Sequence, residues 1–252
     1  MIKNKQNENL FFKAPRYLFR KYNILRIINR LPVKSFVDIG CGAGELACTL
    51  AEKGYKGMGI DFSGDAIAVA ENIRKQRGIS RAILKFKKGS LSELPIKFDL
   101  LISCEVLEHL ENDRKFLKDI HKYSDYFIFS VPARMKWFDV FDEKVGHFRR
   151  YEKKSMIQLL EDEGYEVIEF LSYGYPFINV TRLARKALAS KVHKQKSTEE
   201  MTKQSGINPI KTKFNLGKLN IEIIIKPLYY LSLPFNKYNF SEGYLVLCEK
   251  KK

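Results

Sequence analysis

The sequence VDIGCGAG at residues 37–44 decides the fold of this 252-residue chain. It joins a short apolar run at 35–39 to a segment with helical spacing at 45–53. Because glycine lacks a Cβ, the backbone can turn sharply between these two elements and approach a ligand closely. The first N–H groups of the helix point at the same place. The stretch therefore predicts a strand, a ligand-binding loop and a helix.

Strand-like and helix-like segments alternate outward from this loop, as far as residue 171. Strands are expected at 35–39, 56–60, 82–87, 98–103, 126–131 and 165–171, and helices at 45–53, 65–76, 113–122 and 152–163. Repeated β-then-α units imply parallel strands joined by right-handed crossovers. A seventh strand is expected at 244–247. We therefore predict an α/β fold with a doubly wound seven-stranded sheet and a mainly helical insertion before the last strand.

Four segments follow from this pattern. They are an N-terminal helical segment at 1–34, a ligand-binding core at 35–171, an insertion that caps the core at 172–241, and the final strand of the sheet at 242–252. Within the insertion, a helix is expected at 179–192, a polar loop at 194–213 and an apolar stretch at 219–233.

An acid follows the second expected strand. Asp61 lies 17 residues after Gly44 and ends that strand, where a carboxylate can accept both ribose hydroxyls of a bound nucleoside. The alternative role is to cap the next helix. Ser63 suits that role better, because Asp61 stands two residues too early. The position of Asp61 therefore favours a nucleoside ligand.

A second acid, Asp38, lies inside the loop just before the first glycine. A carboxylate there would repel the pyrophosphate of a dinucleotide, whereas it would attract a ligand with an ammonium group and a sulfonium. The alternative is a structural aspartate that binds loop N–H groups. The acid thus favours an adenosyl sulfonium over a dinucleotide.

At this point the chain resembles the class I S-adenosylmethionine (SAM)-dependent methyltransferases. VDIGCGAGELA at 37–47 is similar to the first motif of this family and GIDFS at 59–63 to its second, and the resemblance covers 35–171 and 243–249. The resemblance implies a seven-stranded sheet whose seventh strand is antiparallel and lies beside the sixth. It also implies SAM as the cofactor and methyl transfer as the reaction.

The resemblance further implies which residues hold SAM. Those expected around its methionine part are Asp38, Gly40, Cys41, Gly42 and Gly44. Asp61 would hold the ribose, and Phe62 would pack on the adenine. Ser90 and Leu91 match the loop at the adenine edge. The family usually has an acid where Ser90 stands, which argues against a side-chain bond to the adenine amino group, but the backbone of Leu91 could still supply a bond.

Two further SAM contacts are expected from other parts of the chain. Cys104 ends the fourth strand and so would lie against the cofactor. Arg20, or Arg16 one turn earlier, would pair with the SAM carboxylate, although either arginine can instead be a surface residue.

The segment EVLEHL at 105–110 follows the fourth strand, where ligands of open α/β sheets bind. Glu105 is therefore expected to lie at the reacting centre. Glu108 and His109 have two open roles. With Glu105 they can hold a divalent ion, as similar residues do in ubiquinone-pathway O-methyltransferases and small-RNA 3′-end methyltransferases. Otherwise they order the loop through hydrogen bonds.

A second acceptor-side segment, GHFRRY at 146–151, resembles a GHxRRY segment found in part of the family. A neutral His147 could remove the proton of an acceptor hydroxyl during transfer, or it could be a structural histidine bonded to backbone. Arg149 and Arg150 could grip a carboxylate or phosphate of the acceptor, or pair with surface acids.

The net charge of +16 comes from 45 basic and 29 acidic residues. Ten Lys/Arg against two Glu lie between residues 182 and 218. The excess attracts polyanions, although a lysine-rich composition alone can explain it. Three interpretations of the insertion stay open: a lid over a small apolar acceptor, a membrane-surface element over 172–235 that receives a lipid-linked acceptor, and, ranked last, a nucleic-acid clamp.

Four cysteines without metal-binding spacing and an N-terminus without an apolar signal segment predict a cytoplasmic protein, at most at a membrane surface. We expect a SAM-dependent methyltransferase that O-methylates a small-molecule, sugar or lipid-linked acceptor, with His147 as base. The alternatives are an RNA methyltransferase that uses the basic insertion and a SAM-binding module without catalysis. Nothing in the sequence indicates the oligomeric state.

Overall fold

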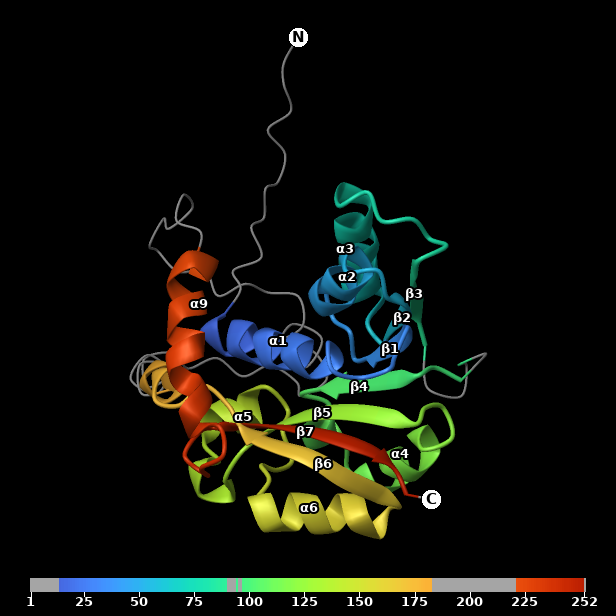
Figure 1. Cartoon of the computed structure of the whole chain (residues 1–252). Helices are drawn as coiled ribbons and strands as arrows, with labels where there is room; N and C mark the ends of the chain where they lie inside the picture. Colours follow the sequence, from blue (N-terminus) through green and yellow to red (C-terminus); the bar gives the residue numbers. More distant parts are fainter. Residues whose placement is uncertain (1–13, 90–93, 95–96, 183–220, 252) are drawn as a thin grey trace.

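A computed structural model describes residues 14–89, 94, 97–182 and 221–251. Seven strands form one sheet in the order β3-β2-β1-β4-β5-β7-β6 (Figure 1). The strands are β1 (Ser35–Ile39), β2 (Lys56–Asp61), β3 (Leu84–Lys88), β4 (Leu100–Cys104), β5 (Tyr126–Pro132), β6 (Tyr165–Ser172) and β7 (Gly243–Lys250). The predicted seven-stranded, doubly wound α/β fold is confirmed.

The strand order reverses between β1 and β4. β1 pairs in parallel with both β2 and β4, so the chain builds the sheet first toward β3 and then outward through β5. Only β7 is antiparallel, and it lies between β5 and β6. In open α/β sheets, ligands bind outside the carboxyl ends of the strands at such a reversal. The topology therefore predicts a ligand site at the carboxyl ends of β1 and β4.

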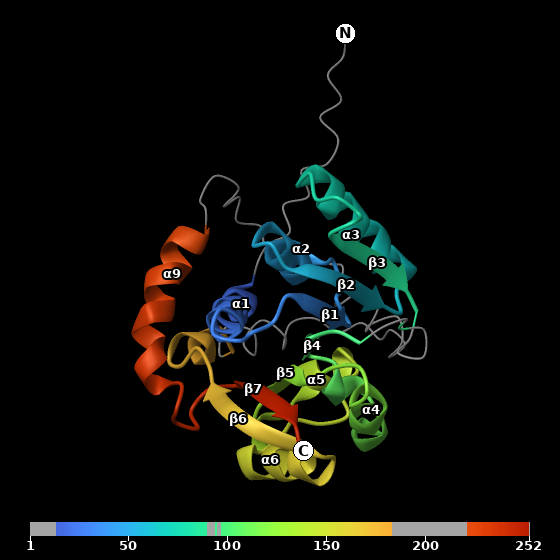
Figure 2. The same cartoon turned by 45° about the vertical axis from the view of Figure 1, so that its right-hand side comes forward.

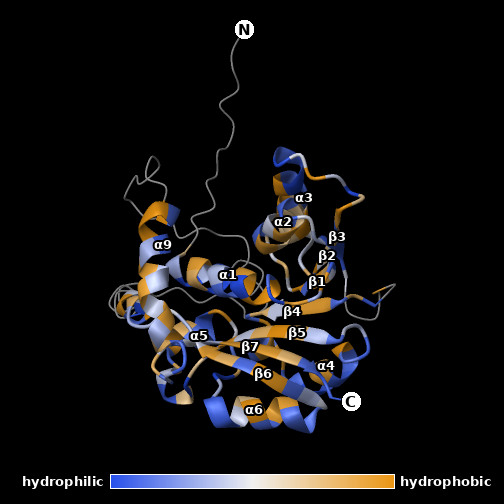
Figure 3. Cartoon of the chain, in the orientation of Figure 1, coloured by the Kyte–Doolittle hydropathy of each residue, from blue (hydrophilic) through white to orange (hydrophobic). Residues whose placement is uncertain are grey.

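Helices cover both faces of the sheet (Figures 1 and 2). They are α1 (Pro15–Ile28), α2 (Glu45–Glu52), α3 (Gly64–Gln76), α4 (Asp113–Ile120), α5 (Val140–Lys144), α6 (Lys153–Asp162) and α9 (Ile221–Ser232). Alternate residues of a strand enter the two cores: Phe36 belongs to the core that includes residues of α1 and α2, whereas Val37 belongs to the core that includes residues of α4 and α6. The central strands β4 and β5 are mainly apolar, as Figure 3 shows, because both of their faces are buried, whereas the edge strand β3 is mainly polar.

α9 belongs to the expected insertion and packs against α1, which lies beside it in both views (Figures 1 and 2). Lys21 Nζ donates to Glu222 Oε1 at 2.9 Å, and the rings of Tyr22 and Tyr229 lie 5.2 Å apart. A buried amide pair, Asn236 Nδ2 to Asn23 Oδ1 at 3.0 Å, holds the end of the segment. None of the described helices is long and apolar enough to cross a bilayer.

The expected helix at 179–192 is helical over its described part, up to Arg182, and its remainder and the polar tract at 194–213 lie outside the described residues. α5 is an element that the sequence pattern does not predict. Its five residues begin at a capping box, in which Asp139 and Asp142 each bond the other's backbone N–H. The division into segments 1–34, 35–171, 172–241 and 242–252 stays a prediction.

Candidate functional site

The loop between β1 and α2 turns through three glycines. Gly40, Gly42 and Gly44 have φ values of +71°, +52° and +73°, a region that side chains with a Cβ rarely adopt. The Gly40 and Cys41 N–H groups donate to the Ile60 carbonyl at 2.8 and 3.0 Å. The loop is therefore fastened to the carboxyl end of β2.

Gly44 is required for space as well as for φ. A Cβ on Gly44 would lie 2.5 Å from the ring of Phe86 on β3 and 2.8 Å from the Ala70 Cβ on α3. The absent side chain thus lets α2 start close to the sheet, with Gly44 as its N-cap residue.

Asp61, at the end of β2, binds two backbone N–H groups. Oδ2 accepts from Gly42 N and Oδ1 from Ser63 N, both at 2.9 Å. Ser63 caps α3, and its Oγ accepts from Ala66 N at 3.3 Å. A carboxylate has about four lone-pair positions, so these two bonds leave Asp61 able to accept from a ligand's hydroxyls.

Asp38 is buried beneath the glycine loop, with 3% of its surface exposed. Burial raises the pKa of Asp38 to about 7, although the Arg20 guanidinium opposes this and the Asp61 charge adds to it. Asp38 therefore gains or loses its proton near neutral pH, and a cationic ligand would stabilise its charged form.

The other residues that are expected to contact SAM lie in different environments. Phe62 is half exposed next to Asp61, and Cys104 is half-buried at the end of β4. Burial raises the pKa of Cys104 to about 12, so it is a neutral thiol. Ser90 and Leu91 lie outside the described residues.

Glu105 holds two arginines of α1 over the end of β4. Its Oε2 lies 2.7 Å from Arg16 Nη2 and its Oε1 lies 3.2 Å from Arg20 Nη1. Ser130 Oγ, on β5, donates to Oε1 at 2.9 Å. Burial opposes ionisation, yet the two arginines hold the pKa of Glu105 at about 2. Both arginines expected at the SAM carboxylate are thus paired with a carboxylate of the chain itself.

His147 is oriented by Asp142 on α5. Nδ1 of His147 lies 2.9 Å from Asp142 Oδ1, while Arg150 Nε donates to Oδ2 at 2.8 Å. Burial works against ionisation, but these bonds hold the pKa of Asp142 at about 2. An ionised carboxylate accepts only, so Nδ1 carries the hydrogen and Nε2 of the neutral ring keeps its lone pair.

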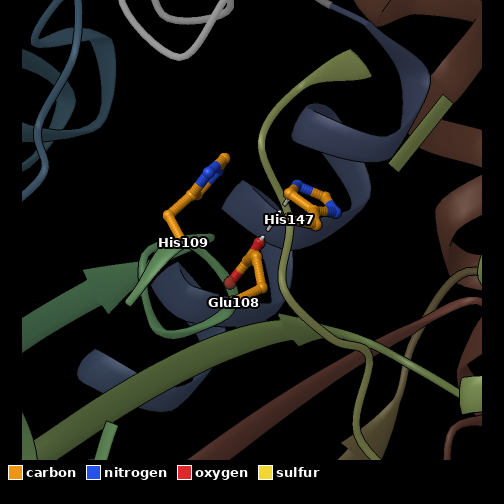
Figure 4. A group of neighbouring side chains, drawn as sticks. All are labelled: Glu108, His109 and His147. Carbon is orange, nitrogen blue, oxygen red and sulfur yellow. Dashed lines mark ion pairs between the residues drawn. The ribbon is translucent and has the colours of Figure 1, made fainter. Parts of the chain in front are cut away.

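Glu108, His109 and His147 lie close together (Figure 4), with one potential ligand atom of each residue within 4.8 Å of those of the other two. Glu108 is completely buried, and neither of its oxygens has a hydrogen-bond partner in the described part of the chain. His147 Nε2 lies 3.9 Å from Glu108 Oε1. His109 Nδ1 donates to the Gly146 carbonyl at 3.1 Å, which leaves its Nε2 as the lone-pair atom. One carboxylate and two such imidazoles are a donor set for a divalent ion.

This group differs from the predicted one by a single member, because His147 stands where Glu105 was expected. Glu105 has a φ of +57° and contacts Arg16 and Arg20 instead. Without a cation, burial and the nearby Glu105 charge raise the pKa of Glu108 well above its usual range. Burial also lowers the pKa of His109 to about 4, so its ring is neutral.

The two arginines of the GHFRRY segment are paired within the protein. Arg150 is buried and forms an ion pair with Asp142, and Arg149 Nη1 lies 3.0 Å from Asp113 Oδ2. The sequence analysis did not identify Asp142 or Ser130 as site residues. Asp142 had a weak local signal, since Asp139-x-x-Asp142 has the spacing of a capping box; Ser130 had none.

Comparisons with known proteins agree with the fold. A family model described as a methyltransferase domain matches residues 32–217. The chain is 36% identical over 96 residues to the mitochondrial ubiquinone biosynthesis O-methyltransferase of Schizosaccharomyces pombe (37% of this chain, 35% of that protein). It is 32% identical over 91 residues to norajmaline N-methyltransferase of Rauvolfia serpentina (34% of this chain, 31% of that protein).

These matches span about a third of the length of the two curated relatives. Among solved structures, magnesium protoporphyrin IX methyltransferase of Synechocystis PCC 6803 with bound SAH is similar in fold, with a TM-score of 0.51 at 22% identity over 62% of this chain and 74% of that one. The family match covers most of the chain and the seven-stranded sheet agrees with it. The chain therefore belongs to the class I SAM-dependent methyltransferases, a family whose cofactor is SAM.

Proposed function

We propose that this chain transfers the methyl group of SAM to a hydroxyl oxygen of a small-molecule, sugar or lipid-linked acceptor. The oxygen attacks the methyl carbon, the bond from that carbon to sulfur breaks, and the sulfonium becomes a neutral thioether. The hydroxyl proton passes to a base. The observation that carries the proposal is the orientation of His147, whose Nδ1 is held by Asp142 so that Nε2 can accept that proton.

The carboxylates at the carboxyl ends of β1, β2 and β4 support SAM as the methyl donor. Asp38 and Asp61 lie at the ends of β1 and β2 on either side of the glycine loop, and each favours positive or hydroxyl-bearing groups over phosphate. Glu105, with a pKa of about 2, is too weak a base to take a proton. Its role in the proposal is to orient Arg16 and Arg20 and to supply negative charge near the sulfonium.

The relatives support a hydroxyl acceptor only in part. The S. pombe relative is a ubiquinone biosynthesis O-methyltransferase, and the R. serpentina relative is an N-methyltransferase. A base beside the acceptor favours oxygen, because a hydroxyl must lose its proton as the bond forms, whereas a neutral amine attacks through its lone pair. The Asp142–His147 pair thus decides our choice of O-methylation.

Binding of a divalent ion is a second candidate role for Glu108, His109 and His147. The residues fit the group, because the buried Glu108 carboxyl has no hydrogen-bond partner in the described chain and each imidazole has its Nδ1 anchored by an acceptor. Two nitrogens and a carboxylate favour a transition ion such as Mn²⁺, Fe²⁺ or Zn²⁺ over Mg²⁺. A bound ion would lower the pKa of an acceptor hydroxyl.

The test is methyl transfer from radiolabelled SAM to a panel of phenols, sugars and polyprenylated phenols, with product and S-adenosylhomocysteine both measured. Labelled O-methyl product supports the proposal. Failure of the protein to bind SAM by calorimetry, or preference for NAD in competition, would contradict it. Metal analysis and activity after EDTA treatment decide between the two roles of His147, since a base needs no ion.

We also propose that α9 meets a membrane surface if the acceptor is lipid-linked. Its exposed face carries Ile223, Ile224, Tyr230 and Leu231, with Lys226 among them. An apolar face with a basic residue suits an anionic bilayer surface. Ile223→Glu/Leu231→Glu should abolish co-sedimentation with phosphatidylglycerol vesicles. Ile168→Glu, which changes an exposed residue of β6, should not. Equal binding by all three proteins would remove this proposal.

A further inference from the structure

The half of the sheet that is not occupied by the glycine loop carries its own set of charged residues. Arg134 follows β5, Arg182 follows β6, and Glu242 precedes β7. Since β7 is antiparallel to both neighbours, Arg134 and Glu242 lie at the same edge as the glycine loop and Glu105, and Arg182 reaches this edge through its contacts with Trp137 and Glu242. If SAM takes the β1 and β2 side of that edge, the acceptor takes the β5, β6 and β7 side.

Two arginine side chains meet there on the chain's single tryptophan. The Cζ atoms of Arg134 and Arg182 lie 4.5 and 4.8 Å from the centre of the Trp137 ring. Arg182 Nη2 also donates to the Trp137 carbonyl at 3.5 Å. Stacking fixes the plane of a guanidinium and leaves its N–H edge free to bind a planar or tetrahedral oxyanion.

The charge of these two arginines is poorly neutralised. In the described chain, Arg134 has no carboxylate within ion-pair distance, and its buried Nε lacks a hydrogen-bond partner. Arg182 Nε lies 3.8 Å from Glu242 Oε2 and has no hydrogen-bond partner among the residues that the structure describes. The other four arginines of the site differ, since Arg16, Arg20, Arg149 and Arg150 each have a carboxylate oxygen within 3.2 Å.

The backbone at Arg134 has a conformation that residues with a Cβ rarely adopt. Arg134 has a φ of +65°, and the only other non-glycine residue with positive φ in the described chain is Glu105. Strained residues of this kind persist where the surroundings fix them, and they gather at binding sites. Here the Arg134 N–H donates to the Tyr151 carbonyl at 2.7 Å, which fixes the turn after β5.

We propose that Arg134 and Arg182 bind an oxyanion of the acceptor, a carboxylate or a phosphate, beside Trp137. This inference rests on the proposed function, because it names the class of acceptor for the same site. It places the charged group of the acceptor at the β5 and β6 end and its methylated hydroxyl toward Glu105 and His147. Arg16 connects the two regions: its Nη2 lies 2.7 Å from Glu105 Oε2 and its Nε donates to Tyr173 Oη at 3.5 Å, while the Tyr173 N–H donates to the Gly243 carbonyl at the start of β7.

Trp137 makes the site directly measurable, because it is the only tryptophan and lies against both arginines. We would titrate the full-length protein with inorganic diphosphate and, separately, with benzoate at constant ionic strength, and follow tryptophan fluorescence. A saturable change is expected with at least one anion. Arg134→Gln and Arg182→Gln should each weaken binding about tenfold, because each removes a charge-assisted pair. Arg134→Lys, which keeps the charge, should retain part of the affinity.

Arg81→Gln is the matched control, because Arg81 is an exposed arginine paired with Glu71 away from this edge. It should leave the titration unchanged. Saturation by diphosphate alone assigns a phosphate-bearing acceptor, and saturation by benzoate alone assigns a carboxylate. No saturation with either anion, or equal affinity in the Arg134→Gln/Arg182→Gln protein, overturns the inference. Thermal melting of each variant would check that it is folded.

Calorimetry with SAM on the same preparations separates this inference from the proposed function. Anion binding at Trp137 without SAM binding would remove the proposed reaction and keep the anion site. SAM binding and methyl transfer without anion binding would remove the anion site and keep the proposed reaction.

Discussion

Asp61 Oδ2 accepts a hydrogen bond from the Gly42 N–H at 2.9 Å, so the acid after β2 holds the glycine loop after β1 in its binding shape. Asp61→Ala should therefore weaken SAM binding tenfold or more, because the ribose loses its acceptor and the loop loses its fastening. The same change should lower the free energy of unfolding by roughly 1–3 kcal/mol, because it leaves the Gly42 and Ser63 N–H groups without partners. Calorimetry and urea unfolding measure the two effects.

Asp61→Asn separates the two roles of this residue. An amide oxygen can still accept from one of the two N–H groups, but the side chain loses a second acceptor and its charge. Most of the stability should return while SAM binding stays weak. Unchanged SAM affinity in Asp61→Ala would remove the ribose assignment.

Asp38 should make SAM binding depend on pH near neutrality. Because burial raises its pKa to about 7, Asp38 is protonated below that pH and cannot attract the sulfonium and ammonium groups. SAM affinity should rise between pH 6 and pH 8, with proton release visible as a dependence of the calorimetric heat on the buffer. Asp38→Asn should bind weakly and show no such rise across this range.

The stability of the ligand-free protein should change in the opposite sense. A raised folded-state pKa means that the folded chain holds more protons than the unfolded chain between about pH 4 and pH 7, so stability falls as pH rises through that window. Asp38→Asn should remove this loss. A ligand-free protein whose stability does not fall between pH 4 and pH 7 would show that Asp38 is not shifted.

Gly44 should be the more costly of two glycines with nearly equal φ. Gly44→Ala brings a Cβ to 2.5 Å from the Phe86 ring at φ +73°, whereas Gly78→Ala, at φ +68°, meets nothing within 4 Å. Both variants bear the cost of a left-handed residue, about 1–2 kcal/mol, and Gly44→Ala adds about 1–3 kcal/mol of overpacking. Urea unfolding of both proteins isolates the steric part. Equal losses of unfolding free energy in the two variants would mean that the close packing of α2 against the sheet does not contribute to stability.

Local patterns predicted the sheet because each strand carries its own signal. The expected strand at 35–39 coincides with β1 (Ser35–Ile39), and that at 82–87 overlaps β3 (Leu84–Lys88). β1 is a mainly apolar run that is buried on both faces, and β3 alternates apolar with polar residues; both patterns are visible without knowledge of the neighbouring strands. α5 (Val140–Lys144) was not visible in this way, because five residues are too few to show a helical period and its capping box comprises only two acids.

The site was predictable where it is local and not where distant segments meet. Asp38 and Asp61 stand at fixed places in their loops, so their positions followed from the strands. The partners of Glu105 did not, because Arg20 and Ser130 are 110 residues apart and meet only when α1 lies over the strand ends. The exchange of Glu105 for His147 in the Glu108 group has the same origin, since the loop that carries His147 returns to β4 from beyond β5.

The pairing of Asp142 with His147 gives the sharpest test of the reaction. His147→Ala should lower turnover by about 10²–10⁴-fold and leave SAM affinity unchanged, because the base acts only on the acceptor. Asp142→Asn should also lower turnover, since an amide can turn its NH₂ toward Nδ1 and so favour the tautomer with hydrogen on Nε2.

If Asp142 acts only through His147, the double variant His147→Ala/Asp142→Asn should be no slower than His147→Ala. Asp142→Asn also loosens Arg150, so its unfolding free energy must be measured beside its rate. Asp119→Asn is the control, because Asp119 pairs with Lys115 on the surface of α4. Rate losses that multiply in the double variant would give Asp142 an independent role, and full activity of His147→Ala would end the assignment of the base.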